Sequence, residues 1–349
     1  MSNLQLDWTA TEILAAPIVD EPLIVRGVVC HGGYDADGVY RSPRTRFRRA
    51  AIDAWQQHHR ETTGTEVLDA PVDSFPGHYP NLDQARFLLA NKVREPIVGL
   101  LTRIGTVEGF GGAIRDLAPT GDVQRHFVED VRGTAIAHLA EGLLEAHARD
   151  ESGWRDEAGH DRMWYAVRDI AFEDPLDEQS DREMRACIEA AAASVPMPTA
   201  FGTREFDGVD PAFETLIAFM TRVLFIEIRA YHAFAWAEAL LSDTDLVAGD
   251  GDAARLVSYI RQDESPHVDY LRTSLSEMRA RTFVGTTRNH IGSDVIGTVW
   301  DTTLAESRSL GDLRNKAVYN ALLDSALVDR KDGQEIRDEH DRLATETAA

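Results

Sequence analysis

Cysteine is nearly absent from this chain. Among 349 residues only Cys30 and Cys187 carry a thiol, which is too few for the disulfide framework of a small secreted protein or for a thiolate metal site. The first residues, Met1-Ser2-Asn3-Leu4, also lack the basic start and apolar core of a signal peptide. A reducing cytoplasm is therefore the expected location.

Positive charge is scarce too. The chain has 36 Lys and Arg against 59 Asp and Glu, a formal net charge of -23, and such a surface repels nucleic acid and anionic lipid. The richest basic stretch, Arg41 to Arg49, is short and is interpreted as one face of a helix. We expect no nucleic-acid partner and no membrane partner.

The most apolar stretch, residues 213–241, is not free of charge. Arg222, Glu227, Arg229 and Glu238 interrupt it, which favours a central helix of a soluble bundle over a membrane span. Glu227 is the only acid in its middle third. A buried carboxylate is costly unless it pairs with a cation or binds a metal, so the alternatives are an ion pair with Arg222 or Arg229 and a metal site.

The remaining pattern predicts an all-α protein after a short irregular or β segment. Short strands and an Asp35-x-Asp37-Gly38 turn are expected within 22–40, a bend at Gly105 to Gly112, a connection at 196–210 and a mobile tail from Lys331 to Ala349. The predicted domains are an N-terminal segment (1–80), a helical bundle (81–285) and C-terminal helices with the tail (286–349). Apolar spacing predicts helices near 44–60, 82–104, 123–150, 154–173, 180–194, 211–242, 252–281 and 312–328.

One pattern occurs twice: Asp156-Glu157-Ala158-Gly159-His160 and Asp263-Glu264-Ser265-Pro266-His267. Both copies are D-E-x-x-H. On a helix the Glu and the His share a face, so that one metal ion can take a carboxylate oxygen and an imidazole nitrogen. Two copies indicate two metal ions. Pro266 either kinks the second helix or, with Ser265 as N-cap, begins it and leaves Glu264 outside; we favour the kink.

Hairpin geometry indicates further ligands, because residues equidistant from a turn lie level on antiparallel helices. About a turn near residue 246, Glu227 lies opposite Glu264 and His267. About a turn at 151–153, Glu145 lies opposite Glu157 and His160, with Glu141 one helical turn away. Either glutamate could be the ligand. The alternative is a solvated ladder of Glu141, Glu145 and Arg149.

The order of these residues along the chain resembles the pattern of the ferritin-like di-iron carboxylate superfamily. That pattern is a Glu on one helix, E-x-x-H on the next, a third Glu and then a second E-x-x-H. This superfamily includes soluble desaturases, bacterial multicomponent monooxygenases and ribonucleotide reductase small subunits. The resemblance spans residues 123–281 and implies a four-helix bundle with additional helices. It implies that Asp156 and Asp263 orient ligand imidazoles. Family spacing would make Glu129 the first Glu instead of Glu141 or Glu145. The implied ligands are Glu141 or Glu145, Glu157, His160, Glu227, Glu264 and His267.

The resemblance implies two Fe ions, with Mn or a mixed Fe/Mn pair sharing the same ligands. The implied function is an O2-dependent oxidase or oxygenase of a small organic substrate, with electrons from a separate protein, and a homodimer is possible. Where reductase subunits place their radical tyrosine, this chain has Trp164, which disfavours radical storage. The alternatives are a di-metal protein without oxygenase activity and a metal-free helical scaffold. A scaffold predicts an Arg partner for Glu227 and a large distance between His160 and His267.

Overall fold

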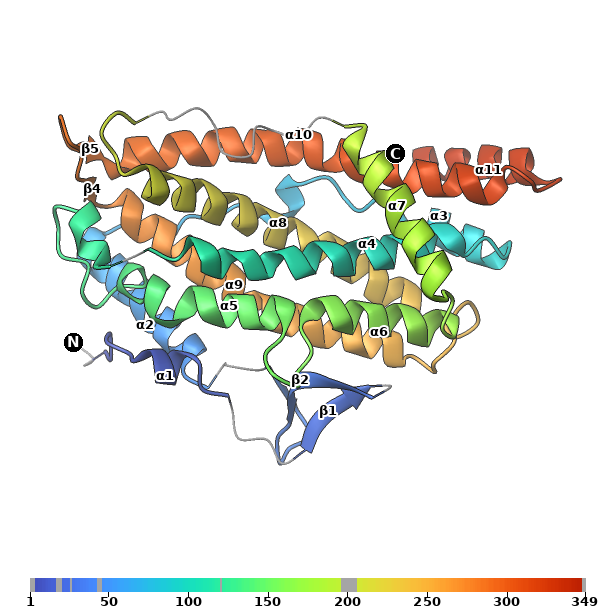
Figure 1. The fold of residues 1–349 in the computed structure, drawn as a ribbon, viewed down its shortest axis with the longest axis horizontal. Coiled ribbons are helices and arrows are strands. Elements are labelled where there is room, and N and C mark those ends of the chain that lie inside the picture. Colours follow the sequence, from blue (N-terminus) through green and yellow to red (C-terminus); the bar gives the residue numbers. More distant parts are fainter. Residues whose placement is uncertain are drawn as a thin grey trace.

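The computed structural model describes residues 4–16, 21–25, 27–42, 46–119, 121–195 and 206–346. The protein is mostly helical, as the sequence predicts, and its longest helices lie roughly along one axis (Figure 1). A sheet of β1 (Glu21–Val25), β2 (Val28–Tyr34) and β3 (Tyr40–Arg41) and a ribbon of β4 (Thr282–Phe283) and β5 (His290–Ile291) are antiparallel. The helices are α1 (Ala10–Ile13), α2 (Arg48–Thr63), α3 (Leu82–Ala90), α4 (Glu95–Gly111), α5 (Leu144–Ser152), α6 (His160–Phe172), α7 (Glu178–Ala193), α8 (Pro211–Leu241), α9 (Asp252–Arg279), α10 (Gly292–Leu327) and α11 (Gly333–Glu346).

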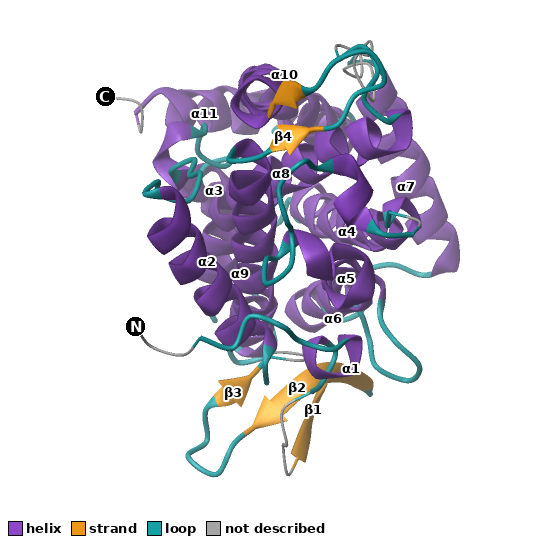
Figure 2. Ribbon diagram, turned by 90° about the vertical axis from the view of Figure 1, so that its left-hand side faces the viewer, coloured by secondary structure: helices purple, strands orange, loops and turns teal. Residues whose placement is uncertain are grey.

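The centre of the molecule is a bundle of α4, α5, α6, α8 and α9. Helices α8 and α9 form the predicted hairpin, α6 packs between α4 and α9, and α10 covers α4 and α8. Helices α5 and α6 do not fold back on each other. They follow end to end along α4, as Figure 1 and the end view of Figure 2 show. The predicted turn at 151–153 is therefore not a hairpin turn.

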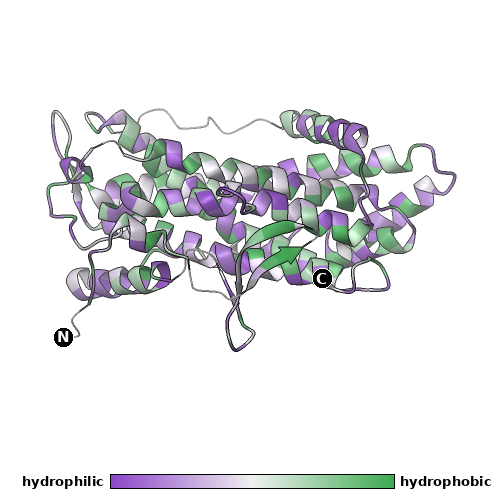
Figure 3. Ribbon diagram, turned by 60° about the horizontal axis from the view of Figure 1, so that its bottom comes forward, coloured by the Kyte–Doolittle hydropathy of each residue, from purple (hydrophilic) through white to green (hydrophobic). Residues whose placement is uncertain are grey.

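Local sequence explains the central helix α8. The Asp210 side chain accepts hydrogen bonds from the N–H groups of Ala212 and Phe213, and Pro211 occupies the first helical position, where a missing N–H costs nothing. Residues on every side of α8 are buried, which accounts for its apolar sequence. The other helices carry both hydrophilic and hydrophobic residues, whereas the N-terminal sheet is mostly hydrophobic (Figure 3).

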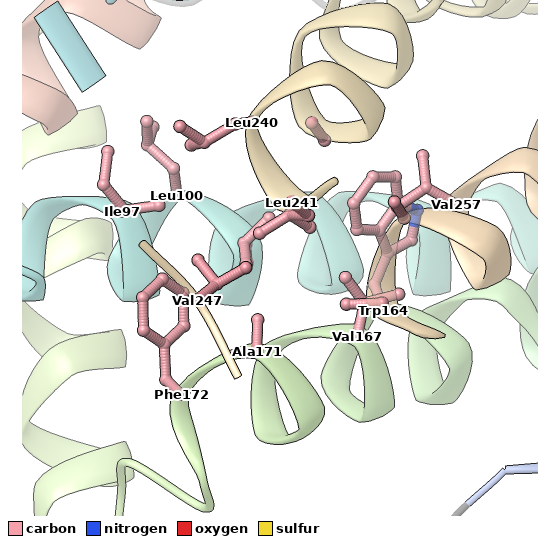
Figure 4. Close-up of a cluster of buried hydrophobic side chains, with 14 of the residues drawn as sticks. Ile97, Leu100, Trp164, Val167, Ala171, Phe172, Leu240, Leu241, Val247 and Val257 are labelled. Atoms are coloured by element: carbon pink, nitrogen blue, oxygen red, sulfur yellow. The ribbon is translucent and has the colours of Figure 1, made fainter. Parts of the chain in front are cut away.

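The core continues along the bundle on either side of its middle. One cluster contains Trp164 of α6 together with Leu240, Leu241 and Val257 of the α8–α9 hairpin (Figure 4). The Trp164 ring stacks on Phe234 at a centroid distance of 5.5 Å. Core packing thus accounts for Trp164.

One helix of the described chain, Glu95–Leu117, is long and apolar enough to cross a membrane by length and composition. It comprises α4 and the turn after it, and it contacts α5, α6 and α10. It also carries Glu108. These contacts are those of a core helix in the bundle.

Several predicted elements differ from the structure. The predicted bend at 105–112 is wrong, because α4 stays helical to Gly111. Between 123 and 143 the chain forms short 3-10 and π turns in place of a helix. The predicted mobile tail is wrong for 333–346, since α11 buries Ile336 and His340.

Other elements agree or remain outside the structure. The strands within 22–40 and the Asp35 turn are confirmed; Asp35 Oδ1 accepts the N–H groups of Asp37 and Val39. Helix α9 continues through Pro266, so the N-cap alternative is wrong. The predicted helix 82–104 is interrupted at 91–94. The predicted helix 154–173 begins only at His160. Most of the predicted connection, 196–205, lies outside the described residues. The domain boundaries remain predictions.

Candidate metal centre

Two groups of potential metal ligands meet in the middle of the bundle. The first comprises Glu108, Glu151, His160 and Glu264, and the second comprises His147, Glu151, Glu227 and His267. Within each group the offered ligand atoms lie within 4.8 Å of one another. Because Glu151 belongs to both groups, its carboxylate lies where one ligand could bridge two ions.

The Glu264 carboxylate also connects the two groups. Its Oε1 lies 2.7 Å from Nδ1 of His160, and its Oε2 lies 2.7 Å from Nδ1 of His267. Glu151 Oε1 lies 3.2 Å and 3.3 Å from the same two nitrogens. Both imidazoles therefore direct Nδ1 toward the two shared carboxylates.

His147 and Glu227 complete the second group. His147 Nε2 lies 3.5 Å from Glu227 Oε1, and the His147 ring stacks on the His267 ring at a centroid distance of 3.9 Å. Arg222 pairs with Glu306 at 3.2 Å. Arg222, one of the two ion-pair partners that the sequence offered for Glu227, thus pairs with another acid, and the pair with Arg229 stays a prediction.

Each imidazole has a partner on its outer nitrogen. His160 Nε2 lies 3.4 Å from Asp263 Oδ2, and His267 Nε2 lies 3.1 Å from Asp150 Oδ2. Asp150 is also bound by Arg48 at 2.8 Å. On His147 the outer atom is Nδ1, which lies 3.0 Å from the Tyr270 hydroxyl. Such outer hydrogen bonds fix the orientation of the ring and the tautomer of a metal-ligating histidine.

A pinched loop brings Glu151 and His160 together although nine positions separate them. The chain leaves α5 at Ser152, forms the loop 153–159 and resumes at His160. At the base of the loop, a Cβ on Gly159 would lie 2.4 Å from both the Glu151 carbonyl oxygen and the Gly153 nitrogen. The Ala158 N–H donates to the Val29 carbonyl of β2, which ties the loop to the N-terminal sheet.

Glycines on α4 bring Glu108 to the centre. A Cβ on Gly111 would lie 2.6 Å from Cγ of Glu151, and one on Gly105 would lie 2.7 Å from the Tyr165 ring. These glycines therefore allow α4 to lie close to α5 and α6. In the sequence they look like helix breakers, but in the bundle they are packing positions.

Burial shifts the pKa values of several side chains in the two ligand groups. Burial, with the negative charges of Glu264 and Glu151, raises the pKa of Glu227 well above its usual value, and the pKa of Glu108 is raised by burial, Glu151 and Glu264. Burial opposes ionisation of Glu264, yet His160 and His267 hold its pKa well below the usual value. Burial and the charge of His267 lower the pKa of His147 to about 3.

The structure brings four of the sequence-predicted ligands together, namely His160, Glu227, Glu264 and His267. It also places Asp263 against His160, as expected. It does not bring Glu141, Glu145 or Glu157 into either group. Glu145 pairs with Arg149 at 2.6 Å, as in the ladder alternative, and Glu141, Asp156 and Glu157 are exposed. Glu129 is bound to Thr282 instead.

Glu108, His147 and Glu151 belong to the ligand groups but are not among the residues that the sequence predicts. Glu108 lay in the segment that was interpreted as a bend, and Glu151 lay in the expected turn. His147 lies two residues after Glu145, so on a helix it does not share the face of the expected ligands Glu141 and Glu145. The signal that could have found two of them is the i, i+4 spacing of His147 and Glu151, which places both side chains on one helical face.

A cavity of about 320 Å³ adjoins the centre. Glu108 lines both the cavity and the first ligand group. The cavity lies between α4 and α8, with α10 and the loop 76–79 as its other walls. Any small molecule in it would lie beside the ligand groups.

The fold and the site together define a helical protein with buried His, Glu and Asp groups that could bind metal. This description is compatible with a ferritin-like di-iron fold. No family model matches the chain, and comparisons with curated proteins and with solved structures find no match.

Proposed function

We propose that this protein is a ferritin-like, non-haem di-iron oxidase or oxygenase that uses O2 to oxidise an organic substrate. The observation that carries the proposal is a set of inward-facing atoms in the centre. Among the described residues, the buried atoms His147 Nε2, Glu151 Oε1, His160 Nδ1 and Glu264 Oε1 form no hydrogen bond of normal geometry, although they lie within ion-pair distance of other atoms of the two groups. Such atoms are costly to bury unless a further group binds them.

Charge supports a pair of divalent ions. The seven side chains of the two groups comprise four glutamates and three histidines. Four ionised carboxylates carry a formal charge of -4, which two divalent cations balance when the imidazoles are neutral. Mixed oxygen and nitrogen ligands suit iron and manganese.

The scaffold alternative has less support. It predicts an Arg partner for Glu227 and distant imidazoles, whereas the rings of His160 and His267 lie 6.0 Å apart and Glu227 lies beside His147. A scaffold held together by salt bridges would also be expected to give these buried atoms hydrogen bonds of normal geometry, which they lack.

When two irons bind, they supply electrons and open positions for O2. The chain holds and shapes the site: Glu151 and Glu264 connect the two groups, and Asp150, Asp263 and Tyr270 orient the imidazoles. The adjoining cavity favours oxidation of an organic molecule over iron storage. Electrons would come from a separate donor protein.

Metal content measured by mass spectrometry, after anaerobic loading of the full chain with Fe(II), tests the proposal. We expect two irons per chain, one for each ligand group. Glu227→Gln should lose one iron, and Glu151→Gln should lose both because Glu151 belongs to both groups. Glu145→Gln, on the same helix but paired with Arg149, serves as the control and should keep both.

Oxygen uptake by the reduced, iron-loaded protein separates the remaining alternatives. Uptake that is lost in Glu151→Gln supports the oxidase or oxygenase. Two bound irons without uptake would leave a di-metal protein of another function, and an iron-free wild type would leave the metal-free scaffold.

A further inference from the structure

The cavity beside the ligand groups has an unusual concentration of positive charge. Four arginines line it, although the chain as a whole has a net charge of -23. Two of them have evident partners: Arg222 pairs with Glu306, and Arg314 donates from Nε to the Ala192 carbonyl at the end of α7. Arg229 also has an interaction of its own, and the fourth arginine is Arg103.

Arg103, one of the four arginines that line the cavity, has no carboxylate neighbour among the described residues. Its Nη2 donates to Asn315 Oδ1 at 2.9 Å, and no carboxylate of the described residues lies within ion-pair distance of it. Burial and the positive charges of Arg314 and Arg229 lower the pKa of Arg103 to about 10, so it remains a cation at neutral pH. A partly buried cation beside other cations is stabilised by an added anion.

The walls of the cavity are mostly apolar. Arg103 and Glu108 lie five residues apart on α4, which is roughly 7.5 Å along the helix axis. Ile104 and Val107 lie between them. From α8 the apolar lining residues are Ile226, Ala230, Ala233 and Phe234, and Arg222, Arg229 and His232 of the same helix also line the cavity.

We propose that this cavity binds an organic carboxylate, with the carboxylate at Arg103 and an apolar body that extends toward Glu108. The planar guanidinium matches a carboxylate in shape and forms paired hydrogen bonds with it. The apolar walls fit a hydrocarbon or aromatic body. This inference rests on the proposed function, because it takes the bound acid to be the substrate of the oxidation. The carbon that is oxidised would then lie in the body of the acid near Glu108, away from the carboxylate.

Isothermal titration of the full-length protein with matched acids and amides tests the inference. The probes are octanoate and octanamide, and 3-phenylpropanoate and 3-phenylpropanamide. We expect at least one acid to bind tenfold or more tightly than its amide, because the amide lacks the charge that Arg103 recognises.

Substitutions locate the recognition. Arg103→Met should remove the preference for the acid over the amide. Arg103→Lys keeps the positive charge but loses the paired N–H donors of the guanidinium, so it should keep part of the preference. Arg255→Met is the matched control, because Arg255 is exposed, pairs with Asp252 and does not line the cavity; it should bind as the wild type does. Circular dichroism confirms that each variant is folded.

The outcomes separate this inference from the proposed function. Equal binding of acid and amide, no binding of either acid, or an unchanged preference in folded Arg103→Met would overturn the carboxylate site. Iron content is measured independently. Bound iron without acid binding refutes only this inference, whereas acid binding without iron refutes only the di-iron function.

Discussion

The two D-E-x-x-H copies have the same pattern but different structures. In 263–267 the residues belong to the continuous helix α9, and Glu264 and His267 both point into the centre while Asp263 lies against His160. In 156–160 only His160 reaches the centre, because the preceding residues form a loop. Glu151, at the end of α5, lies where Glu157 was expected. A Glu and a His three residues apart thus share a site only when the backbone between them is helical.

The largest difference in iron binding is expected between substitutions of the two glutamates, Glu264 and Glu157. Glu264 contacts both His160 and His267, whereas Glu157 is exposed on the loop. Glu264→Gln should therefore lose both irons, and Glu157→Gln should keep both. Iron per chain, measured on the two variants prepared in parallel, checks this. Retention of iron by Glu264→Gln, or its loss from Glu157→Gln, would reverse the comparison.

The next largest effect is expected at the base of the loop. Gly159→Ala introduces a Cβ 2.4 Å from backbone atoms of Glu151 and Gly153, so the loop must open and separate Glu151 from His160. We expect a loss of about 2 kcal/mol in the free energy of unfolding and loss of the iron bound by the first ligand group.

Denaturant unfolding and iron content measure both effects. Gly297→Ala in α10 is the control, since a Cβ there meets nothing within 4 Å, and alanine should be neutral or slightly stabilising in a helix. If the two glycine variants unfold alike, the loop is not held at Gly159.

The sequence predicted the second half of the site better than the first for a physical reason. Apolar periodicity continues on both sides of the α8–α9 turn, so both helices and their register about the turn could be predicted, and with them the approach of Glu227 to Glu264 and His267. The same rule applied at 151–153 assumed a reversal of the chain. There α5 and α6 continue in one direction, and a local pattern does not show whether a glycine-containing loop reverses a chain.

Glu108 could not be predicted from local propensity. Gly105, Gly109, Gly111 and Gly112 disfavour an isolated helix, and only the close packing of α4 on α5 and α6 makes them helical positions. Likewise, the order of α11 comes from contacts of Ile336 and His340 with distant elements. His340 lies 2.7 Å from the Tyr319 hydroxyl of α10. Such tertiary contacts are not encoded in composition.

A smaller difference is expected between the two aspartates. Asp263 lies 3.4 Å from the outer nitrogen of His160, whereas Asp156 is exposed. Removal of a carboxylate that orients a ligand imidazole typically weakens metal affinity about 10- to 100-fold. We expect Asp263→Asn to fall in this range and Asp156→Asn to bind as the wild type does. Competition with a metal-binding dye measures the affinities, and equal values for the two variants would show that Asp263 does not orient His160.

The smallest effect is expected at Pro266, which occupies the motif position of Gly159 in the other copy. Pro266→Ala restores a backbone N–H in the middle of α9, and one such hydrogen bond is worth about 1 kcal/mol. The substitution also removes buried ring carbons, at about 0.8 kcal/mol for each CH2. These terms nearly cancel, so unfolding should change by less than about 1 kcal/mol and both irons should remain. Loss of iron from this variant would mean that the proline shapes the helix between Glu264 and His267, and that both copies depend on an interrupted helix.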